Sequence, residues 1–308
     1  MHPAFSVLVF TVMSGAGYGL ITLMIIGHLS GVAALQQRDL LLAGGGIALL
    51  LVTVGLLSST LHLANPKNAW RAFSRFKTSW LSREAVFAVL FYPFALLYLG
   101  SIWAWGSDVK GIVVLLGAGT AALAMITLFC TSMIYASLKT IRQWNSSLTP
   151  VNYLALGLMS GSLILLAVQS VYTGAPEGLL WSVALVLIVV AGCAKSIYLF
   201  WIGKPAGSTI QTATGFTQAS VRLLDQGHTA NSFLNDEFGY QVAADRLFVL
   251  RVLMCAGAFI VPFILLLWLP VLGWLAALCA LAGLLLERWL FFAEARHVVR
   301  LFHGEQRV

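Results

Sequence analysis

Eight apolar stretches, each long enough to cross a bilayer, dominate this sequence of 308 residues. A membrane span needs about 20 mostly apolar residues, and in lipid its backbone must form its own hydrogen bonds, so each stretch is expected to be a helix. Strands of a membrane β-barrel would be about half as long and would alternate in polarity. The sequence therefore predicts an all-α polytopic membrane bundle of eight transmembrane helices, forming a single integral-membrane domain over residues 1–308. The expected spans are 4–28, 40–63, 84–106, 111–136, 151–173, 178–202, 247–269 and 271–295.

Composition and charge agree with a membrane protein and indicate its orientation. Hydrophobic residues make up 60% of the chain and charged residues only 9%, whereas a soluble domain is about 25% charged. An even number of spans places both termini on one side, which would hold 14 of the 18 Lys and Arg residues, against 2 on the opposite side. The positive-inside rule then predicts a bacterial cytoplasmic (inner) membrane protein with both termini in the cytoplasm. Because orientation accounts for the basic loops, no nucleic acid partner is expected, although a docking surface for an acidic protein would also be basic.

The cytoplasmic connections in this topology are about 64–83, 137–150 and 203–246, with a tail over 296–308. Only 203–246 is long, and it is rich in Thr, Ser, Gln, Asn and Asp. A loop of this length is usually functional or disordered. We interpret it as a partly helical docking element, the alternative being a simple linker.

Neither a metal site nor a haem is predicted in this chain. All four cysteines lie inside apolar runs without a CxxC pair, as expected of small core residues rather than zinc or iron–sulfur ligands: Cys130, Cys193, Cys255 and Cys279. A haem in a bundle would need two facing histidines, but His28 and His62 fall at opposite membrane faces. The N-terminus has neither a basic region nor a cleavage site, so we interpret it as a retained first span.

Two proton-active residues flank the connection between spans 2 and 3. His62 ends one span and Glu84 begins the next. A neutral imidazole can donate to a quinone carbonyl and pass a proton near neutral pH, and a carboxyl group partly withdrawn from water can relay protons. The simpler alternatives are an interfacial histidine and a helix-N-terminal charge with Ser82 as the cap. Because His62 and Glu84 are expected at the same membrane depth, the pair favours proton-coupled chemistry on a lipid-soluble substrate.

Basic and aromatic residues alternate between these two residues. Arg71, Arg75 and Arg83 are interleaved with tryptophan and phenylalanine. The pattern is typical of an amphipathic segment at the membrane interface, and it would equally present cations to an acidic subunit. Both interpretations stay open.

Charged residues also occur within spans 6 and 8, in the cytoplasmic half. They are Lys195, Glu287 and Arg288, and Glu294 lies seven residues after Glu287 on the same helix face. Intramembrane charges are costly and often functional. We consider four interpretations of these residues. The long basic side chains could snorkel to the interface, or Glu287 and Arg288 could form a structural pair. The residues could also support the site near His62 and Glu84, or help to dock a partner. A transporter without a redox role would be expected to carry charges near the midplane or broken helices, and their absence counts against that class.

Four motifs carry a family resemblance: Leu61-His62-Leu63, Pro66, Trp70-Arg71-Ala72-Phe73 and Ser79-Trp80-Leu81-Ser82-Arg83-Glu84. In these motifs and in its eight-span layout, over essentially its whole length, the chain resembles the membrane anchor family of dimethyl sulfoxide reductase. The opening Met1-His2-Pro3-Ala4-Phe5-Ser6 and the loop sequence Val221-Arg222-Leu223-Leu224-Asp225 are similar to the branch that serves cytoplasmic sulfite dehydrogenases reducing quinone.

The resemblance implies a non-catalytic-centre subunit of an oxidoreductase complex. Anchors of this family hold an iron–sulfur subunit and a molybdopterin catalytic subunit against the membrane, here on the cytoplasmic face, and bind a quinone (ubiquinone or menaquinone). The family's quinone-site histidine and glutamate match His62 and Glu84. The resemblance thus implies a sulfite:quinone oxidoreductase that passes electrons from the iron–sulfur subunit to quinone.

Three alternatives remain at this stage. One is the quinol-oxidising anchor of a dimethyl sulfoxide or polysulfide type of reductase, in which electrons flow the other way. In the dimethyl sulfoxide reductase case the termini face outward, whereas the charge count places them inside, which argues against that substrate. The others are a transporter and a passive tether that binds no quinone.

Overall fold

The structure is a computed structural model that describes residues 3–61, 66–176, 178–203, 207–224, 240, 242–303 and 305–308. Its described residues contain eight helices that are long and apolar enough to span a membrane, and no strand, which confirms the predicted bundle. The first six spans are α1 (Phe5–Leu29), α2 (Arg38–Thr60), α3 (Trp80–Trp105), α4 (Gly111–Ala136), α5 (Leu148–Thr173) and α6 (Gly178–Ile202). The seventh comprises α9 (Ala244–Cys255), the π-helical turn η3 (Ala256–Ile260) and α10 (Val261–Trp268), and the eighth η4 (Pro270–Leu272) and α11 (Gly273–Ala293). All bounds lie within four residues of those expected.

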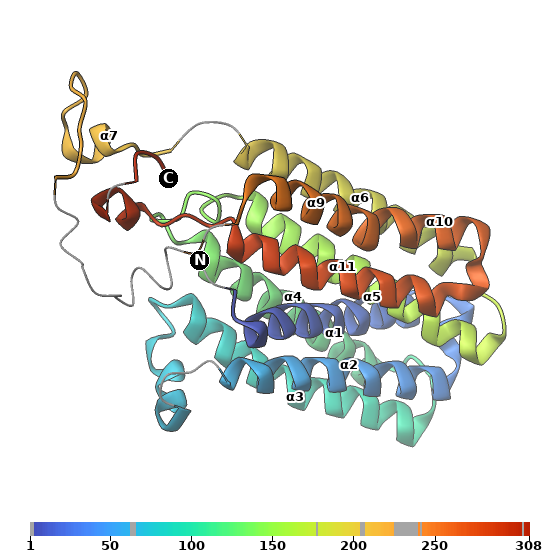
Figure 1. Cartoon of the computed structure of the whole chain (residues 1–308). Coiled ribbons are helices and arrows are strands. Elements are labelled where there is room, and N and C mark those ends of the chain that lie inside the picture. Colours follow the sequence, from blue (N-terminus) through green and yellow to red (C-terminus); the bar gives the residue numbers. More distant parts are fainter. Residues whose placement is uncertain are drawn as a thin grey trace.

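Both termini lie at the same end of the bundle (Figure 1), which we call the terminal face. The short elements η2 (Pro66–Arg75), α7 (Ile210–Thr214) and η5 (Val298–His303) lie at this end, and η1 (Ala33–Gln36) joins α1 to α2 at the other. Helix α7 belongs to the long polar connection, whose residues 225–239 lie outside the described residues.

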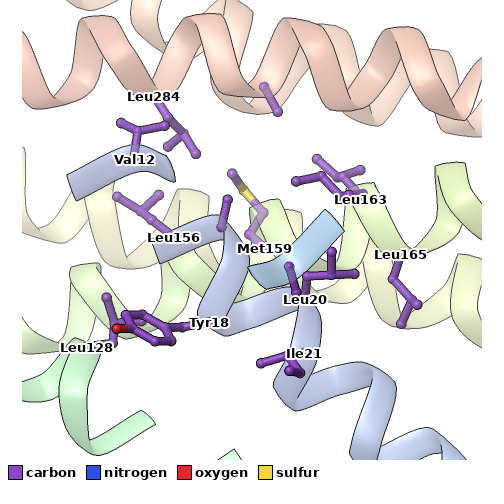
Figure 2. Close-up of a cluster of buried hydrophobic side chains, with 14 of the residues drawn as sticks. Val12, Tyr18, Leu20, Ile21, Leu128, Leu156, Met159, Leu163, Leu165 and Leu284 are labelled. Atoms are coloured by element: carbon purple, nitrogen blue, oxygen red, sulfur yellow. The ribbon is translucent and has the colours of Figure 1, made fainter. Parts of the chain in front are cut away.

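Helices α1 and α5 form the centre of the bundle. Helix α1 packs against α2, α4, α5 and α11, while α5 also packs against α4, α6 and α11. Figure 2 shows the buried apolar side chains that gather where these helices meet, among them Leu20 of α1, Leu128 of α4 and Leu284 of α11 around Met159 of α5. The remaining helices expose many large apolar side chains, as expected for surfaces that face lipid.

Small residues allow α1 and α5 to approach closely. A Cβ atom added to Gly19 would lie 1.9 Å from the Gly157 carbonyl oxygen, and one added to Gly161 would lie 2.2 Å from the Leu20 nitrogen. No side chain other than hydrogen fits at these positions without separating the helices. Tight glycine contacts of this kind provide van der Waals packing between membrane helices, where lipid removes much of the hydrophobic driving force.

A buried histidine fixes the opposite end of the bundle. The Nδ1 atom of His28 lies 2.7 Å from the Tyr98 hydroxyl, and Nε2 lies 3.0 Å from the Ser107 carbonyl oxygen. Nε2 therefore donates to the carbonyl, and Nδ1 pairs with the tyrosine hydroxyl. This arrangement uses both ring nitrogens to join α1 to α3 and to the turn that follows α3.

Candidate functional site

The segment before α3 folds back onto the first turn of that helix. The Ser79 side chain caps α3 by accepting a hydrogen bond from the Ser82 amide. The Ser82 hydroxyl donates to the Ala72 carbonyl and accepts from the Arg75 amide at 3.1 Å. The sequence interpretation of Ser82 as the cap is therefore wrong. Because α3 begins at Trp80, Glu84 lies one turn inside the helix, which withdraws its carboxyl group further from the membrane edge than expected.

The Glu84 side chain is enclosed by neighbouring helices. The residue is 5% exposed, and Oε1 accepts a hydrogen bond from the Thr131 hydroxyl of α4. The same hydroxyl lies 3.1 Å from the Thr127 carbonyl oxygen. When Glu84 is ionised, Thr131 can donate to the carboxylate; when Glu84 is protonated, it can donate to Thr131, which then donates to Thr127. The threonine thus satisfies the carboxyl group in both protonation states.

Two tyrosines complete the surroundings of this carboxyl group. Tyr18 of α1 is almost fully buried and lies within electrostatic range of Glu84 and Thr127. Tyr135 of α4 is also within this range. Sequence reasoning missed both tyrosines. A usable signal was present in α4, where Thr127, Thr131 and Tyr135 recur every four residues and therefore share one helix face.

His62 lies outside the described residues, so its predicted proximity to Glu84 stays a prediction. The preceding residue, Leu61, is the C-cap of α2, whose end lies at the terminal face (Figure 1), and it is 80% exposed. Helices α2 and α3 pack against each other.

The basic and aromatic segment that joins α2 to α3, described over residues 66–80, is exposed. Trp70 and Phe73 are 65% and 46% exposed, and the Arg71 guanidinium lies 5.7 Å from the Trp70 ring centre. Arg75 is exposed as well. The Arg83 guanidinium lies over the Trp80 ring at 4.2 Å and donates to two backbone carbonyls of the segment. This surface offers cations and aromatic rings at the terminal face, and it suits both a membrane interface and an acidic partner.

The charged residues of spans 6 and 8 form what we call the ion-pair cluster. Lys195 Nζ lies 2.5 Å from Glu287 Oε1, and Arg288 Nε lies 2.5 Å from Glu287 Oε2. All three side chains are at most 5% exposed. The Glu287–Arg288 pair considered from the sequence is present, and burial makes all three unsuitable for direct contact with a docked partner.

An arginine-lined hollow of about 540 Å³ opens at the terminal face between the ends of α6, α9 and α11. Its lining includes Arg142, Arg296 and Arg307. An ion pair between Arg251 and Glu294, with both contacts at 2.8 Å, also lines it.

Among the described residues there is no group of three or more His, Cys, Asp or Glu side chains able to hold a metal ion. The expectation that all four cysteines are core residues is partly wrong. Cys130 is buried, but Cys193 is exposed on the outer surface of α6, and Cys255 and Cys279 are partly exposed. An apolar run cannot distinguish the core side of a membrane helix from its lipid side, because both are apolar.

Comparison with known proteins decides the family. The chain matches the DMSO reductase anchor subunit (DmsC) family over residues 1–293. It belongs to this anchor-subunit family. It is also 36% identical to a sulfite dehydrogenase subunit of Allochromatium vinosum over 326 aligned residues, which cover 98% of this chain and 99% of that protein. The chain is thus a multi-pass membrane anchor subunit of an oxidoreductase complex, and its family implies catalytic and iron–sulfur partner subunits.

Proposed function

We propose that this anchor subunit binds and reduces membrane quinone in a molybdenum and iron–sulfur sulfite:quinone oxidoreductase. Sulfite would be oxidised at a molybdopterin cofactor in the catalytic subunit, and electrons would reach quinone through clusters in the iron–sulfur subunit. Quinone is the substrate of this chain, which binds it, orients it and supplies protons. The similarity over nearly the full length to a subunit of a sulfite dehydrogenase supports this substrate class.

The single observation that carries the proposal is the setting of Glu84. Its carboxyl group is buried about one turn, or roughly 6 Å, from the terminal end of α3. Thr131 accommodates both of its protonation states. A carboxyl group that can release and regain a proton without losing its partner suits a reaction in which quinone takes up two protons with two electrons. Trp80, one turn before Glu84 in α3, contacts Phe129 of α4 with ring centres 5.9 Å apart, and these rings would provide an apolar surface for a lipid-soluble ring.

His62 would be the second proton donor in this proposal. Its position directly after the described end of α2, together with its motif, supports this assignment. The basic charges of the terminal side support a cytoplasmic location for both termini and for the docked subunits in the inner membrane. Arg71, Arg75 and Arg83 would then face the iron–sulfur subunit or the anionic lipid around it.

The test uses the intact complex purified from membranes. Replacing Glu84 by Gln, or His62 by Ala, is expected to reduce sulfite-dependent quinone reduction by about 10²-fold or more, the lower end of what positioned proton transfer contributes. Sulfite oxidation with a soluble artificial acceptor should be unchanged. Asp108→Asn, at the exposed opposite end, is the matched control. Unchanged quinone turnover in both site variants would overturn the proposal.

A second candidate is the quinol-oxidising anchor of a dimethyl sulfoxide or polysulfide type of reductase. The family's name, DMSO reductase anchor subunit, favours it. Labelling of single cysteines placed in the tail over 296–308 discriminates the two orientations. Reaction only with reagents that have entered the cytoplasm supports the sulfite-oxidising form, whereas labelling from the periplasm supports the reductase.

A further inference from the structure

The arginine-lined hollow at the terminal face carries an excess of positive charge. Its described lining contains five arginines and two glutamates, an excess of three positive charges, or of two once the terminal carboxylate of Val308, which also lines it, is counted. The arginines are Arg142, Arg251, Arg296, Arg300 and Arg307. Guanidinium groups gathered around one space favour an anionic ligand, because their planar donors match the oxygens of phosphate and carboxylate groups.

Ion pairs account for only part of this charge. Two arginines and both glutamates form the pairs Arg251–Glu294 and Arg300–Glu305, with closest contacts of 2.8 and 2.9 Å. The side chains of Arg296 and Arg307 are exposed, and neither forms a hydrogen bond or an ion pair with the described part of the chain. These two guanidinium groups are therefore available to a ligand.

The C-terminal tail forms one wall of the hollow, and backbone hydrogen bonds hold it in place. The Val298 amide donates to the Thr140 carbonyl at 3.0 Å, which joins the tail to the connection between α4 and α5. The Ile210 amide donates to the Gln306 carbonyl at 3.1 Å, which joins the tail to α7. The two available arginines lie within two residues of these contacts. A wall that is ordered before a ligand arrives reduces the entropy lost on binding.

The hollow lies at the level where the spans end. Ile202 is the last residue of α6, Ala293 is the last of α11, and Leu247 belongs to the first turn of α9; all three line the hollow at the terminal face (Figure 1). Phe200 and Phe248 are within two residues of this lining, and each is 70% exposed. Apolar surface of the kind that faces lipid therefore extends to the neighbourhood of the hollow.

The space is large enough for a lipid headgroup. Its volume of about 540 Å³ is within the range of roughly 300–1,000 Å³ for ligand sites. A second hollow of about 370 Å³ shares Arg142 and Arg296 with it and is also lined by Lys139. The Arg142 guanidinium lies 4.9 Å from the ring centre of Trp201, and tryptophan is enriched at the depth of the headgroups.

We propose that the arginine-lined hollow binds the headgroup of an anionic phospholipid. Arg296 and Arg307 hold its phosphate, and its acyl chains lie along the exposed apolar surface of α6 and α9. Basic pockets at the ends of membrane helices are typical sites for such headgroups. A soluble phosphate compound would use the arginines but not the apolar surface beside them. The inference goes beyond the proposed function and does not depend on quinone chemistry, since no bond is formed or broken.

A bound lipid would connect elements that pack against different partners. Helix α6 packs against η3 and α10 of the seventh span, whereas α9 packs against α11. The ends of α6, α9 and α11 and the tail all contribute to the lining of the hollow. A headgroup held there would join them at the terminal face, so the lipid should stabilise the folded protein by mass action.

The test uses the intact complex, purified in a neutral detergent and freed of bound lipid. The probes are dioleoyl phosphatidylglycerol, which is anionic, and dioleoyl phosphatidylcholine, which has the same chains and phosphate but no net charge. Inorganic phosphate is the third probe, added at an ionic strength matched with chloride. Native mass spectrometry measures the affinity of the tightest lipid site, and thermal unfolding measures the stabilisation by each lipid.

The hollow variant combines Arg296→Gln with Arg307→Gln. The matched control combines Arg222→Gln with Arg246→Gln, which removes the same two charges from exposed arginines of the terminal side that do not line the hollow. A third variant replaces Arg296 and Arg307 by lysine and so retains both charges.

The parent should bind phosphatidylglycerol about tenfold more tightly than phosphatidylcholine, or more, and should unfold at a higher temperature in its presence. In the hollow variant, affinity for phosphatidylglycerol should fall by about 25-fold, because each basic residue near an anionic headgroup contributes about fivefold. Its affinity for phosphatidylcholine should be unchanged. The control variant should match the parent, and inorganic phosphate should not displace the lipid.

Equal affinity of the hollow variant and the control variant for phosphatidylglycerol would overturn the proposal, as would a parent that does not distinguish the two lipids. Displacement by inorganic phosphate would assign the hollow to a soluble anion instead. If the hollow variant is less stable even without lipid, the lysine variant decides, because it should retain most of the binding; a folded lysine variant that binds no better than the glutamine one contradicts the proposal. A map of the complex with acidic side chains of a partner subunit in the hollow would also overturn it.

Discussion

Replacing Gly161 by alanine is expected to separate the two central helices. The added Cβ atom would lie 2.2 Å from the Leu20 nitrogen and 2.3 Å from the Gly19 carbonyl carbon. Ordinary van der Waals contacts of a Cβ atom begin near 3.4 Å, and both obstructing atoms belong to backbone that cannot rotate away. Helices α1 and α5 must therefore move apart locally by about 1 Å.

The cost follows from the contacts that this movement weakens. A gap of 0.5–1 Å removes about a quarter to a half of the roughly 0.1–0.2 kcal/mol that each atom pair contributes. Over some tens of atom pairs between α1 and α5, the loss is on the order of 2–4 kcal/mol, which overlaps the upper part of the usual range of about 1–3 kcal/mol for an overpacked site and extends beyond it. Because these two helices are central, the loss should lower the stability of the whole bundle.

The assay is thermal unfolding of the purified subunit or complex in detergent, followed by loss of the monodisperse species. Gly46→Ala is the matched control, since a Cβ atom there meets nothing within 4 Å on an exposed face of α2. Alanine at that position should be neutral or slightly stabilising, because it favours the helix over the unfolded chain. If Gly161→Ala unfolds at the same temperature as Gly46→Ala, the inferred contact between α1 and α5 is wrong.

Two further predictions concern charge. Glu287→Gln leaves Lys195 and Arg288 buried without a carboxylate, so the subunit should lose about 3–5 kcal/mol of stability; a melting temperature equal to that of the parent would contradict this. The second prediction concerns His297, where burial lowers the pKa of the imidazole below its usual value. Its neutral ring accepts a hydrogen bond from the Val299 amide at 3.1 Å, so the stabilisation is present above the ordinary pKa of about 6.5 and is lost as pH falls below it. Amide exchange over 298–303, corrected for its intrinsic pH dependence, should therefore accelerate at pH 5.5 relative to pH 7, whereas His297→Gln, which cannot titrate, should remove this difference.

The helical architecture could be read from the sequence because the bilayer imposes it. Span length and apolar character were sufficient to locate all eight helices within four residues, without any knowledge of packing. The start of α3 was placed too late because Trp80 and Arg83 are interfacial residues that an apolar count excludes. That error matters, since the true start places Glu84 inside the helix and makes Ser79 the cap.

The neighbours of Glu84 could not be predicted in the same way. Thr131 comes from α4, and only the rotation of that helix about its axis brings the threonine hydroxyl to the carboxyl group. Hydropathy carries little information on rotation, because the lipid-facing and core-facing sides are both apolar. For the same reason, the sequence could not predict that Cys193 is exposed or that Lys195 pairs with Glu287.

The central position of α1 has a consequence for biogenesis. This span precedes the others in the chain, yet two of its contact surfaces are covered by α5 and α11, which are synthesised more than a hundred residues later. Until those helices insert, the glycine-lined side of α1 has only lipid or the insertion machinery beside it. An early hairpin of α1 with α2 is therefore the expected first intermediate, and the membrane chaperones of the cell would have their longest contact with the helix that ends up most enclosed.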